Sequence, residues 1–388
     1  MIGPALGALP PPGAGCRITV VIPARNESAD IGAALAALGE QLDLAGNRLS
    51  RDVFDVIVFA NNCSDDTAAV ARERAAAARL PAYVVEADLR AADAHIGAAR
   101  KYVMDLAAAR FQAAEMPLGL IASTDSDTVV DRQWIAYTLR EARAADAVAG
   151  HVAIAPADQA RLLAPVRLLY ARELSYRRSV AEIEALLDPL PEDPLPRHSA
   201  FVGASFAVTA RTYIAAGGLP PRRRLEDLHF SYALRRIDAR IRHSPFVRAT
   251  TSARAAARVD GGFGSFIARL HQCAERGETF SVEHPQCTID RLERRRALRR
   301  VWQAGARNSD ELAALAERLP HRTPPDWPRL LAGAATFGAF YEDAKALYPQ
   351  PPRPDVNVEI AIETLRVAAQ RHISQRSLAR DDARSSSA

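Results

Sequence analysis

The sequence has few cysteines, few aromatic residues and no long apolar run. Its four cysteines form no Cys-x-x-Cys pair and no tight group with histidine, so neither a disulfide framework nor a structural zinc site is expected. Reduced thiols are typical of a cytoplasmic protein. No stretch approaches the roughly 18 consecutive apolar residues that a membrane span requires, so we expect no transmembrane segment and at most peripheral membrane contact.

Aromatic residues make up 6% of the 388 positions, and the formal net charge is only +4. The basic clusters are not interleaved with the aromatic side chains that a base-stacking surface needs. Nucleic acid is therefore not an expected partner. The first 15 residues are rich in Pro, Gly and Ala, but they have no basic segment and prolines interrupt their apolar stretch. We expect a loose tail there and no signal peptide.

Two phosphate-binding motifs are also missing. No Gly-x-Gly-x-x-Gly follows the first predicted strand, and no Gly-x-x-x-x-Gly-Lys-Ser/Thr occurs anywhere in the chain. These motifs supply the backbone N–H groups that hold a dinucleotide or a nucleoside triphosphate. Both of those ligand classes are therefore disfavoured.

Apolar, β-branched runs alternate with helical patterns through the first third of the chain. The predicted strands cover residues 16–23, 54–60, 83–86 and 118–123, and helical patterns follow the first three of them. This alternation predicts an α/β fold with a doubly wound, mostly parallel sheet and helices on both faces. In such sheets ligands bind beyond the carboxyl ends of the strands.

Three of these strand ends carry polar residues, within 23–27, 61–67 and 124–128. In the last of them Asp125 and Asp127 stand two positions apart, and residues i and i+2 of a strand point to the same side. Two carboxylates that face one point repel each other, and a hard divalent cation bound between them usually offsets this repulsion. The alternative is that both are loop-capping aspartates at the surface.

Four segments, in this order, resemble the family 2 glycosyltransferases, the inverting sugar transferases of the GT-A fold. They are Pro23-Ala-Arg-Asn-Glu27, Ala60-Asn-Asn-Cys-Ser-Asp-Asp-Thr67, the Asp-x-Asp at 125–127, and Leu225-Glu-Asp-Leu228. The resemblance covers about residues 17–267. It departs at Ala60, where many members have an acidic residue, and at Lys101, where an asparagine is common. The Gln/Arg-x-x-Arg-Trp motif and the transmembrane helices of processive members are missing, so a polymer-extruding synthase is not expected.

The resemblance implies roles for the acidic residues. Asp127 is implied to bind Mg²⁺ or Mn²⁺ against a sugar donor's diphosphate, with Asp125 sharing the metal or lying near the ribose. Asp227, preceded by Glu226, is implied to be the general base that deprotonates the acceptor hydroxyl. The alternative for Glu226 and Asp227 is that carboxylates at the start of a helix are favoured by its macrodipole.

The first two motifs are implied to bind the nucleotide. Pro23, Arg25 and Glu27 are expected around the base and ribose. Asn61 can both donate to and accept from a base edge, which suits uracil, and Asp65 is the second candidate. The alternative for Asn61 and Asp65 is a turn and a helix N-cap.

The remaining segments carry weaker signals. The proline-rich stretch 188–198 is expected to be irregular, either an acceptor-side lid or disordered. Glycines near 261–264 favour either close approach to a ligand or a sharp turn. The basic stretch 291–300 is expected on a helix, as a solvated face or a contact to anionic lipid. We predict a flexible tail over 1–16, a catalytic domain over 17–270, a helical C-terminal extension over 271–380 and a disordered tail over 381–388.

The sequence therefore predicts a metal-dependent, inverting glycosyltransferase of hexosyltransferase type. Its partners would be a nucleotide-diphosphate sugar, with a UDP-sugar favoured, and an acceptor hydroxyl that the sequence does not identify. One alternative is a non-catalytic protein that binds nucleotide sugars. A nucleotidyltransferase is a weaker alternative, because the Gly-rich basic loop expected after the first strand is missing.

Overall fold

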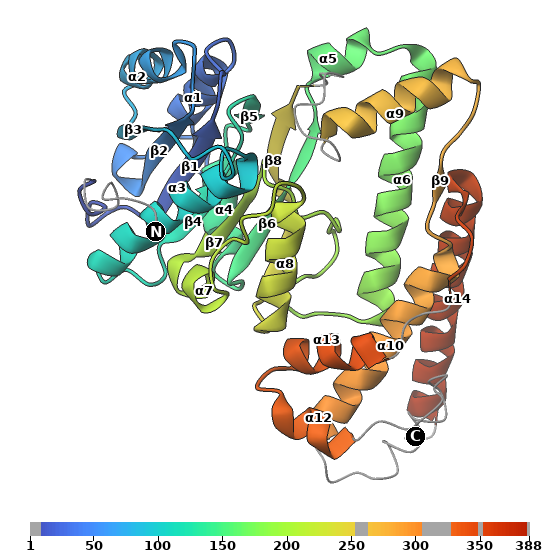
Figure 1. Ribbon diagram of the computed structural model, residues 1–388. Helices are drawn as coiled ribbons and strands as arrows, with labels where there is room; N and C mark the ends of the chain where they lie inside the picture. Colours follow the sequence, from blue (N-terminus) through green and yellow to red (C-terminus); the bar gives the residue numbers. More distant parts are fainter. Residues whose placement is uncertain (1–8, 253–262, 305–326, 348–351, 386–388) are drawn as a thin grey trace. The chain divides into compact units, whose positions relative to one another are not determined.

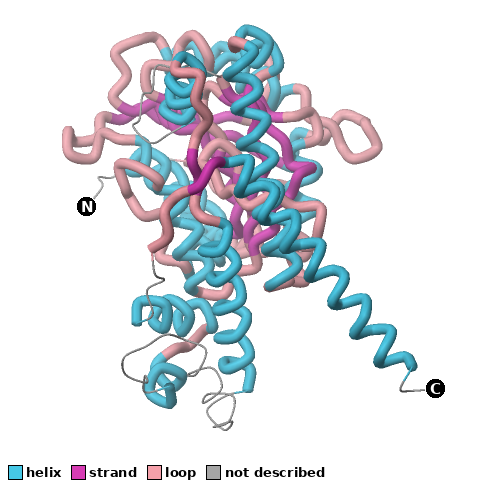
Figure 2. The backbone as a smooth tube through the Cα atoms, turned by 90° about the vertical axis from the view of Figure 1, so that its right-hand side faces the viewer, coloured by secondary structure: helices cyan, strands magenta, loops and turns pink. Residues whose placement is uncertain are grey.

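The computed structural model describes residues 9–252, 263–304, 327–347 and 352–385, and its backbone is drawn in Figures 1 and 2. The chain forms two compact units. The first consists of Met1–Leu162, Ala200–Arg235 and Ala239–Ala268, and the second of Leu163–Ser199, Arg236–Asp238 and Arg269–Ala388. Residues 305–326 and 348–351 of the predicted helical extension and the glycines at 261 and 262 lie outside the described residues.

An eight-stranded sheet forms the centre of the first unit (Figure 1). Its order is β3-β2-β1-β4-β7-β6-β8-β5, with four parallel pairs of neighbours; β7 is antiparallel to both β4 and β6, and β5 is antiparallel to β8. The strands are β1 (Ile18–Ala24), β2 (Phe54–Asn61), β3 (Ala82–Ala87), β4 (Leu120–Ser123), β5 (Thr128–Val130), β6 (Ala147–Ile154), β7 (Phe206–Thr209) and β8 (Ile241–Thr251). The predicted mostly parallel sheet is confirmed.

The central strands are apolar at almost every position. All residues of β1 and β2 are buried, as expected for parallel strands covered by helices on both faces. The sequence analysis ended the first strand at Pro23, but β1 continues to Ala24, which pairs with Ala60. A proline this close to the end of a strand removes a single N–H from the ladder, so one more residue can follow it.

Helices cover both faces of the sheet, as predicted. One face carries a core cluster that includes Phe111 of α3 and Phe230 of α8; the other packs against Leu35 of α1 and Trp134 of α4. The helices of this unit include α1 (Ile31–Gly39), α2 (Thr67–Ala77), α3 (Ile96–Ala113), α4 (Trp134–Glu141), α5 (Pro156–Arg161), α7 (Ala210–Ala215) and α8 (Glu226–Arg236).

The second unit is mainly helical, which confirms the predicted C-terminal helical extension. Its long helices α6 and α14 pack against each other, with Ile183 and Leu365 in one apolar cluster. Its elements include α6 (Ala164–Leu187), β9 (Ser281–Val282), α10 (Pro285–Ala304), α12 (Trp327–Gly333), α13 (Phe337–Leu347), β10 (Val356–Asn357) and α14 (Val358–Ser385), while α9 (Phe263–Glu275) begins in the first unit. No helix in the described part of the chain is both long and apolar enough to cross a bilayer.

The basic stretch 291–300 lies on α10, and part of its charge is neutralised within the protein. Arg291 pairs with Glu283 at 2.8 Å, and Arg299 pairs with Asp188 at 3.1 Å and also lies over the ring of Phe337. Arg295 forms a further ion pair with Asp188. Residues 188–198 have no helix or strand, as expected. Three of the arginines on α10 are therefore held by internal carboxylates.

Asp188 provides the first prediction, because its side chain is only 2% exposed. Burial raises the pKa of this carboxyl, but Arg299 and Arg295 outweigh that effect and hold the pKa below its ordinary value. The pKa of this carboxyl in the unfolded chain is about 4. The stabilisation is therefore complete above about pH 4 and is lost as the pH falls through the lower pKa of the folded state. We expect Asp188→Asn to lower the free energy of unfolding by about 3 kcal/mol at pH 7.

Urea unfolding at pH 7 and at a series of pH values below 4 measures this effect. The matched control is Asp343→Asn, which removes an exposed ion pair with Arg236 and should cost no more than about 0.5 kcal/mol. Equal losses in the two variants would show that burial of the Asp188 pair contributes nothing.

Candidate active site

The three polar strand ends lie next to one another at one edge of the sheet, namely the edge formed by the carboxyl ends of its parallel strands. β1 is hydrogen-bonded to β2 on one side and to β4 on the other, and all three are parallel. The segments that follow these strands therefore emerge at the same edge, where ligands of such sheets bind.

Arg100, on α3, is the central residue of this edge. Its side chain is 3% exposed. It donates to Ser123 Oγ at 2.6 Å, to the Gly203 carbonyl at 3.0 Å, to Asp125 Oδ1 at 2.8 Å and to Glu226 Oε1 at 3.1 Å. These five residues, here called the Arg100 cluster, come from four segments that are far apart in the sequence.

In the Arg100 cluster, one guanidinium offsets the repulsion between two carboxylates. Burial lowers the pKa of Arg100, but Asp125 and Glu226 outweigh this and raise the pKa above its ordinary value, so the guanidinium stays charged. Burial also raises the pKa of Glu226. A fixed protein cation therefore compensates Asp125, where the sequence analysis considered only a metal ion.

Arg100 was not predicted as a site residue. A signal was nevertheless present. Arg100 follows Ala99 and precedes Val103 and Met104 on the buried side of α3, and an arginine is almost never fully buried unless it is paired.

Two glycines permit the close approaches that the Arg100 cluster requires. A methyl group on Gly203 would lie 2.7 Å from Nη2 of Arg100, and one on Gly97 would lie 1.9 Å from the carbonyl oxygen of Arg222. The second contact allows the segment before α8 to run against the first turn of α3. Because α8 begins at Glu226, this approach brings its first turn to Arg100.

Asp227 is held beside the Arg100 cluster. Its Oδ2 accepts the backbone N–H of Gly203 at 2.7 Å, and its Oδ1 accepts that of Leu228 at 2.7 Å. Each carboxylate oxygen has two lone pairs, so both retain capacity for a further donor. The macrodipole of α8 favours acidic residues in this turn, but it does not explain why Glu226 binds Arg100 or why Asp227 binds Gly203.

Asp127 has different partners from Asp125. It accepts hydrogen bonds from Thr251 Oγ1 at 3.4 Å and from Ser252 Oγ at 3.1 Å, at the end of β8. The two aspartates do not lie on a strand, because β4 ends at Ser123 and a turn follows it. The alternation of side chains along a strand is therefore not what places them.

Asp65 and Glu27 connect the segments that follow β1 and β2. Asp65 accepts the backbone N–H of Ser28 at 3.2 Å and that of Thr67 at 3.1 Å. Slight burial opposes the effect, but hydrogen bonds from Thr67 and Ser28 lower the pKa of Asp65 to about 2. Glu27 is buried, and its backbone N–H donates to Thr67 Oγ1 at 2.7 Å. Asp65 thus joins the segment after β1 to the start of α2.

The other predicted nucleotide-binding residues lie nearby on the same strand ends. Asn61 is 3% exposed and donates to Asn62 Oδ1 at 3.4 Å. Pro23 is buried within β1, while Arg25 is exposed and donates to the Ala94 carbonyl at 3.1 Å. The structure therefore places all five predicted nucleotide-binding residues after or within β1 and β2.

The donor atoms of this edge suit a hard divalent cation. Among the residues that the structure describes, no group of three or more His, Cys, Asp or Glu side chains is arranged to hold a metal ion. Asp125 and Asp127 nevertheless supply carboxylate oxygens, with the hydroxyls of Thr251 and Ser252 beside them. Mg²⁺ is commonly bound by one or two carboxylates together with substrate phosphates, so the residues present fit such an ion.

Several solved structures are similar to this chain at low sequence identity. The mannosyltransferase PcManGT from Pyrobaculum calidifontis, in complex with GDP-Man and Mn²⁺, is 15% identical, with a TM-score of 0.42 over 97% of this chain and 82% of that one. S. aureus TarS 1–349 in complex with UDP-GlcNAc is 14% identical, with a TM-score of 0.43 over 86% and 93%. M. tuberculosis glucosyl-3-phosphoglycerate synthase is 19% identical, with a TM-score of 0.35 over 72% and 87%.

A search of curated protein sequences finds no match to this chain. The sequence model of one family does match it, over residues 19–178, and the description of that family is glycosyl transferase family 2. These residues include β1, β2 and both aspartates of the Asp-x-Asp segment. Over this N-terminal part, the chain is therefore similar to glycosyl transferase family 2.

Proposed function

We propose that this protein transfers a hexose from a nucleotide-diphosphate sugar to an acceptor hydroxyl, with inversion at the anomeric carbon. The observation that carries the proposal is the Arg100 cluster, which joins Asp125 to Glu226 and, through Gly203, to Asp227. A donor-side carboxylate and a candidate base are thereby held at one edge of the sheet. The match of residues 19–178 to the family model supports the same reaction class. Residues 17–270 are the proposed catalytic domain, and a cytoplasmic location is proposed because the four cysteines form no disulfide.

Asp227 is the proposed general base. It takes the proton of the acceptor hydroxyl as that oxygen attacks the anomeric carbon, while the nucleoside diphosphate leaves from the opposite face. The backbone N–H groups of Gly203 and Leu228 fix the carboxylate in place. Arg100 and Glu226 act as positioning residues, because Arg100 binds the carbonyl of Gly203 and Glu226 binds Arg100.

On the donor side, Asp127 and Asp125 would hold Mg²⁺ or Mn²⁺. When bound, such an ion neutralises the charge of the diphosphate leaving group. Pro23, Arg25, Glu27 and Asn61 are proposed to surround the base and ribose, with a UDP-sugar favoured, while Asp65 shapes the segment that contacts them.

The test of this proposal is donor binding, measured by calorimetry with UDP-, GDP- and dTDP-sugars, each in the presence of Mn²⁺ and of a chelator. We expect one donor class to bind in the presence of Mn²⁺ only. Asp127→Ala should weaken this binding by at least about tenfold, the scale on which metal sites respond to the loss of a supporting group. The control is Asp52→Asn, an exposed aspartate just before β2, at the opposite edge of the sheet.

Donor binding that is equal with Mn²⁺ and with chelator would refute the proposed metal site. Donor binding without transfer to any acceptor, and without donor hydrolysis that depends on Asp227, would instead favour a non-catalytic nucleotide-sugar-binding protein.

A further inference from the structure

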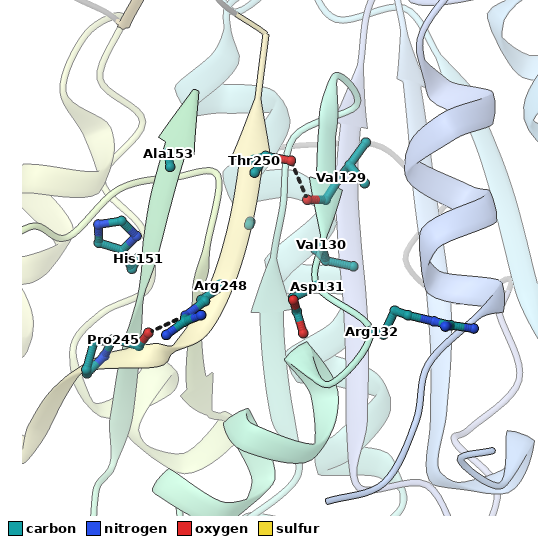
Figure 3. A pocket seen from close by; sticks show the side chains of 10 residues that line it. Val129, Val130, Asp131, Arg132, His151, Ala153, Pro245, Arg248 and Thr250 are labelled. Atoms are coloured by element: carbon teal, nitrogen blue, oxygen red, sulfur yellow. Dashed lines mark hydrogen bonds between the residues drawn. The ribbon is translucent and has the colours of Figure 1, made fainter. Parts of the chain in front are cut away.

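A cavity of about 610 Å³ lies on one face of the sheet where β5, β8 and β6 run side by side (Figure 3). Strand register arranges its floor in two rows. His151 pairs with Arg248, and the carbonyl of Arg248 accepts the backbone N–H of Asp131 at 2.9 Å. In the second row Thr250 lies between Ala153 and Val129. Six side chains, five from these three strands and that of Asp131 from just beyond β5, therefore share one face of the sheet.

This face is the one on which Asp227 lies. Side chains of a strand alternate between faces, and Ala147 and Ala149 of β6 belong to the same core cluster as Phe230 of α8. The pairing of β6 with β8 shifts register between Gly150 and His151. Val148 and Val152 nevertheless both pack in the cluster on the opposite face, so His151 and Ala153 continue the face of Ala149 toward the carboxyl end of β6. Helix α8 leads through a short turn into the start of β8, so α8 itself begins at the edge of the sheet where β8 ends. The first turn of α8 and the cavity therefore lie on the same face and at the same edge of the sheet.

The cavity also adjoins the residues that hold Asp127. Thr250 lines the cavity, and the next two residues, Thr251 and Ser252, donate to the Asp127 carboxylate. On the other side, Val129 lines the cavity two residues after Asp127. The same two strands therefore form the cavity and support the proposed metal-binding aspartate.

The charges of the cavity favour an anion. Arg248 is exposed, and among the described residues the only hydrogen bond of its side chain runs from Nε to the Pro245 carbonyl at 2.9 Å (Figure 3). Its two terminal nitrogens remain available for a ligand. The other cation, Arg132, donates to Glu40. Asp131, the one carboxylate of the lining, uses Oδ1 to accept the backbone N–H of Gln133.

We propose that this cavity is the acceptor subsite and that it takes a small hydroxylated molecule carrying a carboxylate or phosphate group. The inference rests on the proposed function and deepens it. Arg248 binds the anionic group through its terminal nitrogens, the geometry that suits carboxylate and phosphate oxygens. The apolar surfaces of Val129, Ala153 and Pro245 pack against the carbon skeleton. The volume lies within the range usual for small-molecule sites.

The experiment is ligand-observed NMR with glycerate, glycerol 3-phosphate and glycerol, on protein with and without the nucleotide and Mn²⁺. We expect both acids to bind and glycerol to bind at least about tenfold more weakly, as a charge-assisted hydrogen bond implies. Comparing glycerate with glycerol 3-phosphate decides between carboxylate and phosphate. Arg248→Ala should remove the preference for the acids, and Ala153→Phe should block all three probes by filling the cavity.

The matched control is Arg17→Ala, an exposed arginine at the opposite edge of the sheet, which should leave probe binding unchanged. Equal binding of acids and glycerol, or an acid preference that survives Arg248→Ala, would overturn the inference. If the nucleotide binds but no acid does, the inference fails and the proposed function stands. If acids bind through Arg248 but no nucleotide sugar binds, the proposed function fails and the cavity is not an acceptor subsite.

Discussion

Replacing Asp227 by asparagine is expected to lower the rate of sugar transfer by about 10²- to 10⁴-fold, the usual contribution of a general base. The amide cannot take the proton of the acceptor hydroxyl. It keeps the size of the carboxylate, and its oxygen can still accept the N–H of Gly203, so the turn before β7 stays in place. Donor affinity should change by less than about threefold, because Asp227 acts on the acceptor. The measurement is the initial rate of transfer at saturating donor, with donor affinity measured by calorimetry.

The control for this variant is His229→Ala. His229 lies two residues further along α8 and packs edge-on against the ring of Tyr232, outside the Arg100 cluster. It should retain most of the wild-type rate. A rate in Asp227→Asn close to that of His229→Ala would show that another group takes the proton.

The second large effect is expected at Arg100. Arg100→Met leaves the carboxylates of Asp125 and Glu226 without their common cation, and Glu226 is almost fully buried. Removing one partner of a buried ion pair typically costs about 3–5 kcal/mol, which is a large part of the total stability of a domain. We expect a loss of this size in urea unfolding, together with loss of transfer.

A second substitution separates the electrostatic effect from simple loss of packing. In the double variant Arg100→Met/Glu226→Gln the buried negative charge is gone, so the loss of stability should be smaller than in Arg100→Met alone. Transfer should remain low, because Gly203 and Asp125 have still lost the hydrogen bonds that Arg100 donates to them. If the double variant loses as much free energy of unfolding as Arg100→Met and Glu226→Gln lose together, the two side chains are not coupled.

Local patterns in the sequence determined the framework of the first compact unit. The buried, β-branched runs of β1 and β2 and the apolar run of β4 were predicted because burial on both faces leaves a continuous apolar signature. Their parallel arrangement followed from the intervening helices. The rule that ligands bind at the carboxyl ends of such strands then pointed to Asp125, Asp127 and Asn61.

The antiparallel strands required the tertiary structure. β5 has three residues and β7 has four, too few to show a period in the sequence. The contacts within the chain also place α6 in the second unit with the C-terminal helices. In the sequence, however, α6 lies between two parts of the first unit. The predictions for the two aspartates were right about position at the sheet edge, but wrong about why they are placed there, because a turn begins after Ser123.

The sequence by itself therefore determined the four strands β1 to β4, the edge of the sheet at which the chemistry is proposed and the acidic residues there. Only the tertiary structure decided that Arg100 binds Asp125 and Glu226, the latter 126 positions away in the sequence. It also decided that His151, Arg248 and Val129 share one cavity. The physical reason is that periodicity records whether a residue is buried, whereas the partner of a buried charge depends on long-range packing, here on close approaches at Gly97 and Gly203.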